Sequence, residues 1–167
     1  MSKNIIWHIG LFVFSVLIQV LFMDNIQFYS LVNPYFYVLF ILLLPINTPR
    51  YLLLILGFAL GLTIDVFANT PGIHASATVF MAFLRPFMIN TANIDEQEKT
   101  ISPTIMNMGV GWFIKYSLVL ILFHHTFLFF VEIFSFHSFL NTILRSVLSG
   151  LFTFVLILLS QFIIYRK

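Results

Sequence analysis

The ionisable residues with the clearest chemical potential lie in the stretch 57–85, which reads GFALGLTIDVFANTPGIHASATVFMAFLR. Two apolar arms meet there at a polar turn, 69–72, with Asp65 in the first arm and His74 at the start of the second. Burying a charge in hydrocarbon costs at least ~2.5–3.5 kcal/mol, so an ionisable residue in an apolar segment is a functional hypothesis by default. Asp65 and His74 are close enough across the turn to pair, although Asp65 could instead cap backbone donors of the loop.

Small residues accompany Asp65 in the first arm. Gly57, Gly61 and Asp65 are spaced four residues apart, which places them on one face of a helix. The GxxxG spacing of the two glycines permits another helix to approach closely. Packing within the chain and packing against a partner helix both remain open interpretations of this face.

The second arm follows the glycine of the turn, Gly72, and repeats the pattern. His74 and Ala75 open a run of small residues, and His74 lies on the same helix face as Arg85. We expect Asp65, His74 and Arg85 to fix the hairpin or a partner by polar contacts worth about 0.6–2 kcal/mol each in a membrane.

Four further ionisable residues of the apolar segments have plainer interpretations. His124 and His125 could carry protons or bind a metal, but adjacent residues on a helix point about 100° apart, so we interpret both as packed interior residues. Trp112 marks an interface close to Lys115, and Arg145 falls at the opposite interface when about 20 residues are counted back from Tyr165. Snorkelling to the headgroups is the favoured interpretation for both cations.

Composition assigns the chain to the membrane. Hydrophobic residues make up 60% of its 167 residues and charged residues only 8%, whereas soluble proteins have about 25% charged residues. A net charge of +2 without a basic patch argues against a nucleic-acid partner. Cysteine is absent, which excludes disulfides and thiolate-bound metals. Nucleotide-binding, zinc-protease and nucleophile-elbow motifs are also absent, so we expect no enzyme, no cofactor and no metal.

The apolar runs predict an all-α integral membrane protein with six transmembrane helices in one domain, 1–167. The second run is too short to cross alone unless it uses the apolar tail of the preceding loop. A tight turn at 47–50 should make runs two and three an antiparallel hairpin. The predicted spans are 5–23, 35–46, 51–67, 73–89, 105–131 and 139–165.

The positive charges predict the orientation, because cytoplasmic loops hold the excess of Lys and Arg. With six spans and the N-terminus inside, Lys3, Arg50, Lys99, Arg166 and Lys167 all fall on the cytoplasmic side. The opposite loops, near Asp24, Asn69 and Glu132, contain no Lys or Arg. Both termini are therefore predicted to be cytoplasmic.

At the hairpin the sequence resembles the rod shape-determining protein MreD family. The resemblance lies in the glycine-containing helix ending at Asp65 (GFALGLTIDVF), in the turn NTPGIHA with Gly72, His74 and Ala75, and in AFLRP with Arg85. It implies a non-enzymatic, multi-pass component of the bacterial inner membrane, with a fold similar to the S-components of energy-coupling-factor vitamin transporters. The implied partners are an MreC-type membrane protein and, through it, the actin-like MreB filament and the cell-wall synthases.

Two functions follow as hypotheses. The first is a scaffold of the cell-elongation, peptidoglycan-synthesising machinery, whose helix faces at Gly57, Gly61 and Ala75 bind the transmembrane helix of an MreC-type partner. Membrane lipid is a further expected neighbour, and a homo-oligomer is left open. The alternative is a small-molecule-binding S-component with a pocket between helices on the outer side, although the outer loops offer few polar groups to orient a ligand.

Overall fold

The long apolar runs fold as helices, because backbone N–H and C=O groups in a membrane must be satisfied within the protein. The computed structural model describes residues 2–25, 32–92, 100–134 and 139–164. Within these residues the chain is helical and forms no sheet. The five longer helices are α1 (Ser2–Leu21), α3 (Arg50–Ala68), α4 (Ile73–Ile89), α6 (Val110–Ile133) and α7 (Phe139–Ile164).

Four helical segments are long and apolar enough to cross a membrane: Ile5–Asn25, Arg50–Ala68, Val110–Ile133 and Phe139–Ile164. The first of them is α1 continued by the 3-10 turn η1 (Met23–Asn25). α4 is also apolar but, at 17 residues, shorter than these four. The chain is thus an α-helical membrane protein, as composition predicted.

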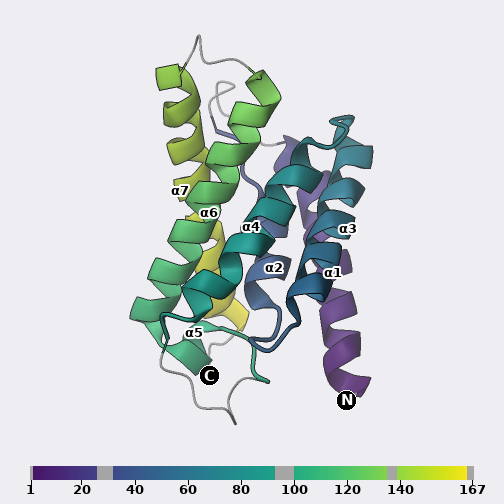
Figure 1. The fold of residues 1–167 in the computed structure, drawn as a ribbon, viewed down its shortest axis with the longest axis vertical. Helices are drawn as coiled ribbons and strands as arrows, with labels where there is room; N and C mark the ends of the chain where they lie inside the picture. The colour runs from purple at the N-terminus through teal and green to yellow at the C-terminus, as the bar shows by residue number, and fades with distance from the viewer. Residues whose placement is uncertain (1, 26–31, 93–99, 135–138, 165–167) are drawn as a thin grey trace.

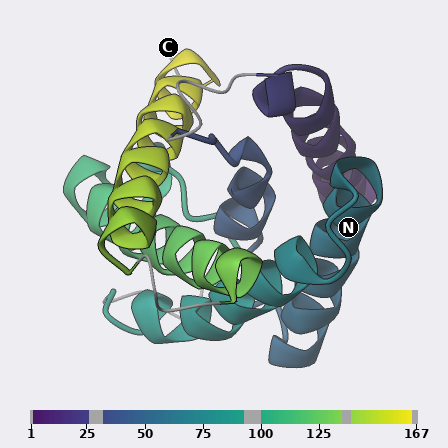
Figure 2. The same ribbon diagram turned by 90° about the horizontal axis from the view of Figure 1, so that it is seen from above.

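The second predicted span is not a continuous helix. Residues 32–35 are not helical, and they lead into the 3-10 turn η2 (Phe36–Val38) and the short helix α2 (Leu39–Leu43). Every residue from Pro34 to Leu44 is buried, and α2 lies in the middle of a ring made by the longer helices (Figure 2). The longer helices enclose this segment, so it forms part of the core instead of facing lipid.

The fifth predicted span, 105–131, is also interrupted. A short helix, α5 (Ile105–Met108), ends at Gly109, and α6 begins at the next residue. Gly109 has φ +80°, a conformation that glycine adopts without the steric cost that a Cβ imposes. The break precedes Trp112, near which the sequence placed the interface.

Figure 1 shows how the elements run. α1, α3 and α6 rise from the end of the bundle where α1 begins and α7 ends, here called the terminal end. α4 and α7 run the opposite way, from the end that carries the 69–72 turn, here called the hairpin end. The segment 32–49 also descends, so it and α3 form the antiparallel pair that the 47–50 turn predicted.

Packing is closest along the series α3, α4, α6 and α7, each helix contacting the next. α1 packs on η2, α2 and α3. The residues Asp95, Glu96, Glu98, Lys99, Tyr165, Arg166 and Lys167, and the side chain of Lys3, lie outside the described residues. The part of the charge pattern that rests on them stays a prediction.

Candidate functional site

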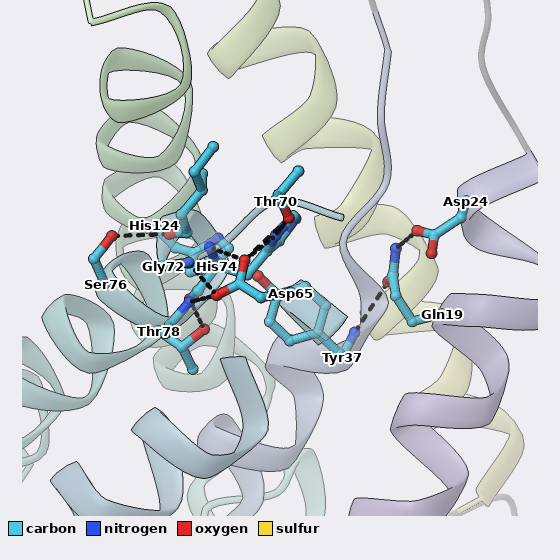
Figure 3. A network of polar contacts seen from close by, with 12 residues as sticks. Gln19, Asp24, Tyr37, Asp65, Thr70, Gly72, His74, Ser76, Thr78 and His124 are labelled. Atoms are coloured by element: carbon cyan, nitrogen blue, oxygen red, sulfur yellow. Dashed lines mark hydrogen bonds and ion pairs between the residues drawn. The ribbon is translucent and has the colours of Figure 1, made fainter. Parts of the chain in front are cut away.

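Asp65 is the centre of the hairpin's polar network (Figure 3). Its carboxylate is 3% exposed and accepts hydrogen bonds from three backbone N–H groups at the start of α4. Gly72 N and Ala75 N donate to Oδ2 at 3.1 and 3.0 Å, and His74 N donates to Oδ1 at 2.9 Å. The first turn of a helix leaves its N–H groups unpaired, so Asp65, from the end of α3, caps the N-terminus of α4.

The side chain of His74 adds to the same carboxylate. Its Nδ1 lies 3.1 Å from Asp65 Oδ1, and a carboxylate only accepts, so Nδ1 carries the hydrogen in this contact. Thr70 Oγ1 donates to Asp65 Oδ1 at 3.0 Å and lies 2.9 Å from the same Nδ1. The predicted pair across the turn is therefore present, together with the capping role that the sequence left as its alternative.

The glycines of α3 allow this approach of the two helices. A Cβ at Gly61 would lie 2.5 Å from both Ala75 Cα and His74 O, which are backbone atoms of α4. A Cβ at Gly57 would meet Ala82 Cβ at 3.1 Å. The faces that carry Gly57, Gly61 and Ala75 are thus filled by the chain's own hairpin, the intramolecular one of the two interpretations. Two residues of the turn are left-handed: Asn69, with φ +55°, and Gly72, with φ +86°, a conformation that glycine adopts without the steric cost of a Cβ.

Arg85 lies near the other end of α4, and its side chain contacts α2 instead of the hairpin turn. The side chain is 1% exposed, and its Nη2 donates to Leu44 O, at the C-terminal end of α2. Its Nε donates to Tyr116 Oη at 2.9 Å, and that hydroxyl donates to Leu42 O at 2.9 Å. The last carbonyls of a helix lack intrahelical donors, so Arg85 and Tyr116 together satisfy the end of α2.

Side chains from α1 and α7 satisfy the opposite end of the segment 32–44, which contains η2 and α2 and is here called the central segment. The backbone N–H groups of Asn33, Tyr35 and Tyr37 donate to Ser149 Oγ, Thr153 Oγ1 and Gln19 Oε1 at 3.0, 3.0 and 3.4 Å. Irregular backbone at membrane depth is tolerated only when protein or water satisfies it. Two of these N–H groups explain why α7 buries the hydroxyls of Ser149 and Thr153 among its apolar residues.

His124 and His125 are both fully buried, as predicted for interior residues. His124 Nε2 lies 2.9 Å from Tyr37 Oη, and His125 Nε2 lies 3.0 Å from Thr153 Oγ1. Among the described residues, no group of three His, Asp or Glu side chains could hold a metal ion. The two histidines therefore belong to the polar contacts that hold the central segment.

Lys115 and Arg145 differ from one another. Lys115 is exposed near the start of α6, which fits the predicted snorkelling. Arg145 Nη1 instead pairs with Glu132 Oε2 at 3.3 Å, and its guanidinium lies 4.3 Å from the centre of the Phe129 ring. Arg145 is thus anchored to α6 at the hairpin end.

A polar cavity of about 320 Å³ opens at the hairpin end. Its wall combines carboxylates, a guanidinium, an imidazole and aromatic rings, which is more polar lining than the outer loops indicated. The lining residues are Met23, Asp24, Asn33, Pro34, Tyr35, Phe67, Ala68, Thr70, His74, Glu132 and Arg145.

Sequence reasoning found the Asp65–His74 pair but missed the residues that hold the central segment. Gln19, Tyr116, Ser149 and Thr153 are polar residues inside apolar helices, and that placement is the signal that could have found them. Comparisons of the chain with protein-family models, with curated proteins and with solved structures find no match.

Proposed function

We propose that the protein is a non-enzymatic membrane scaffold of the MreD type, which binds the transmembrane helix of an MreC-type partner in the cell-elongation machinery. The observation that supports it is an internally bonded bundle whose outer faces are apolar. The hairpin turn and both ends of the central segment are hydrogen-bonded within the chain, so they need no partner to complete them. Large apolar side chains of α1, α3 and α7 remain exposed.

The proposed topology has six crossings in the inner membrane, with both termini in the cytoplasm. The segment 32–49 is the second crossing, and α4 is the fourth. Two observations support this. The first turn of α1 and the last turn of α7 lie at the same end of the bundle, the terminal end (Figure 1). Arg50 and Lys115 also belong to helix ends there, as an excess of positive charge on the cytoplasmic side requires.

The partner's helix needs a surface other than the glycine faces, because α3 and α4 occupy those themselves. The best candidate is an apolar groove between α1 and α3, with a volume of about 730 Å³. Ile9 and Phe12 of α1 form one wall and Leu52 and Leu56 of α3 form the other. Grooves of this kind accept the apolar face of a helix, and the floor is the central segment at Phe40 and Leu44.

Co-purification tests the proposal. The tagged protein is expressed with the MreC-type protein of the same genome and solubilised in mild detergent, and the recovered partner is quantified. Leu52→Trp fills the groove and should lower recovery at least about tenfold at equal protein level. Leu151→Trp, on the exposed face of α7, is the matched control and should leave it unchanged. Equal recovery with both variants would count against the groove, and no recovery with the unmodified chain would count against the scaffold.

The small-molecule carrier remains a second candidate because of the polar cavity at the hairpin end. Ligand pockets combine apolar walls with a few convergent polar groups, and this cavity places Asp24, Tyr35 and Arg145 around one space. Neighbouring genes distinguish the two functions. MreB- and MreC-type genes beside this one favour the scaffold, whereas a pair of ABC ATPase genes favours the carrier.

A further inference from the structure

A second polar cavity, about 240 Å³ in volume, lies at the terminal end, opposite the hairpin. The turn between α2 and α3 forms one side of it and the C-terminal end of α4 forms the other. Among the residues that the structure describes, the lining includes two arginines and no acidic residue: Ile46, Asn47, Thr48, Pro49, Arg50, Arg85, Pro86, Ile89 and Asn90.

Arg85 brings a buried positive charge to this cavity. Within the described part of the chain, its hydrogen bonds go to neutral oxygens: Tyr116 Oη and the carbonyls of Leu44 and Pro45. The contacts of its Nη1 and Nη2 with Pro45 O are long, at 3.5 and 3.4 Å. No carboxylate pairs with Arg85 among the residues that the structure describes. The helix dipole of α2 supplies only about half an elementary charge at its C-terminus, so the positive charge is incompletely balanced.

Arg50 and the start of α3 add to the positive potential. The side chain of Arg50 is exposed and forms no hydrogen bond or ion pair within the described part of the chain. The N-cap position of α3 is Pro49, and no side chain caps the helix there. Unpaired N–H groups and the positive end of the dipole at a helix N-terminus favour an anion. Asn47 and Asn90 line the same cavity and are also exposed, so their amides are available as donors.

The terminal end is where α3 begins and α4 ends, so in the proposed topology the cavity lies at the depth of the lipid headgroups. Under the positive-inside rule this is the cytoplasmic leaflet, whose anionic lipids bind basic pockets between transmembrane helices. We propose that this cavity, the arginine pocket, binds a phosphate group and holds it between Arg50 and Arg85. An anionic phospholipid or free inorganic phosphate could each supply this group. The pocket lies away from the polar cavity at the hairpin end.

Native mass spectrometry of the full chain in a non-ionic detergent tests the arginine pocket, because no charged membrane surface then contributes general attraction. The probes are phosphatidylglycerol, phosphatidylcholine and, in a parallel thermal-stability assay, inorganic phosphate. We expect one phosphatidylglycerol molecule to bind the unmodified chain saturably. Its affinity for the Arg50→Gln variant should be at least about tenfold lower. The Arg50 side chain is exposed and makes no hydrogen bond or ion pair with the described residues, so this variant should fold. Arg50→Lys should restore most of the binding.

Lys115→Gln is the matched control, since Lys115 is an exposed cation near the same end that does not line the pocket. It should leave the adduct unchanged. Stabilisation by inorganic phosphate that Arg50→Gln abolishes, without a lipid adduct, assigns free phosphate as the source. The lipid adduct alone assigns the lipid.

Three results would overturn the proposal. The first is an adduct equally strong with Arg50→Gln, and the second is equal binding of phosphatidylcholine and phosphatidylglycerol without any response to phosphate. The third is binding that begins only after Asp95, Glu96 and Glu98 are replaced by amides, because the chain's own carboxylates would then be the natural counter-charge.

Discussion

Replacing Asp65 by asparagine should destabilise the hairpin severely, although the change in shape is small. One carboxylate oxygen becomes an NH₂ group, which only donates. At the Oδ2 position it would face the N–H groups of Gly72 and Ala75. At the Oδ1 position it would face the backbone N–H and the Nδ1–H of His74, and also the Thr70 hydroxyl, which can turn to accept. Either orientation leaves two buried donors without an acceptor. Each costs about 1–3 kcal/mol, so we expect a total of about 2–5 kcal/mol, since such costs are not strictly additive.

Equilibrium unfolding in mixed micelles of mild detergent and SDS, followed by circular dichroism, measures this cost. Asp24→Asn is the matched control at the same end of the bundle. Asp24 is exposed and accepts one described hydrogen bond, from Gln19 at 2.7 Å, so its replacement should change the free energy of unfolding by less than about 1 kcal/mol. If Asp65→Asn were as stable as Asp24→Asn, the carboxylate would not be the cap of α4.

The same titration tests two further contacts. Gly61→Ala should cost about 3 kcal/mol, because its Cβ would lie 2.5 Å from backbone atoms of α4; Gly57→Ala, whose nearest contact is at 3.1 Å, should cost about 1 kcal/mol, and equal costs would contradict the close approach at Gly61. Tyr116→Phe should cost about 2–3 kcal/mol, because it removes the hydroxyl that links Arg85 to α2. Tyr51→Phe is its control, since Tyr51 is 69% exposed, and indistinguishable stabilities of the two variants would refute the capping role of Tyr116.

Local pattern was sufficient to predict most helices. The run 73–89 coincides with α4, and the run 51–67 differs from α3 by one residue at each end. Length and hydropathy decide such helices because each one satisfies its own backbone. The i, i+4 spacing of Gly57, Gly61 and Asp65 likewise placed these residues on one face, and the turn brought Asp65 to His74.

The central segment could not be predicted in the same way. Its run, 35–46, is apolar like the others, but its backbone depends on side chains that lie far away in the sequence. Thr153 is 118 residues from Tyr35, and Arg85 is 41 residues from Leu44. The spacing of residues within one helix gives no information on such distant contacts. For this reason the sequence predicts that Arg85 fixes the hairpin or a partner, whereas in the structure it caps α2.

The packing of α3 against α4 also limits where a partner can bind. The sequence left open whether the glycine faces meet another helix of the chain or a helix of another protein. In the structure α4 occupies these faces. Gly61→Leu would therefore disturb the folding of the hairpin, and a loss of partner binding could not be attributed to a lost interface. Variants of the groove between α1 and α3 separate these two effects, because its walls are not part of the hairpin contacts.

Site-specific photocrosslinking in intact cells tests the proposed scaffold most directly. A benzoylphenylalanine placed at Leu52 in the groove should crosslink to the MreC-type partner, and the same residue at Leu151 on the exposed face of α7 should not. Crosslinking from Leu151 alone, or from neither position while both proteins are present at normal levels, would contradict the binding of a partner helix between α1 and α3.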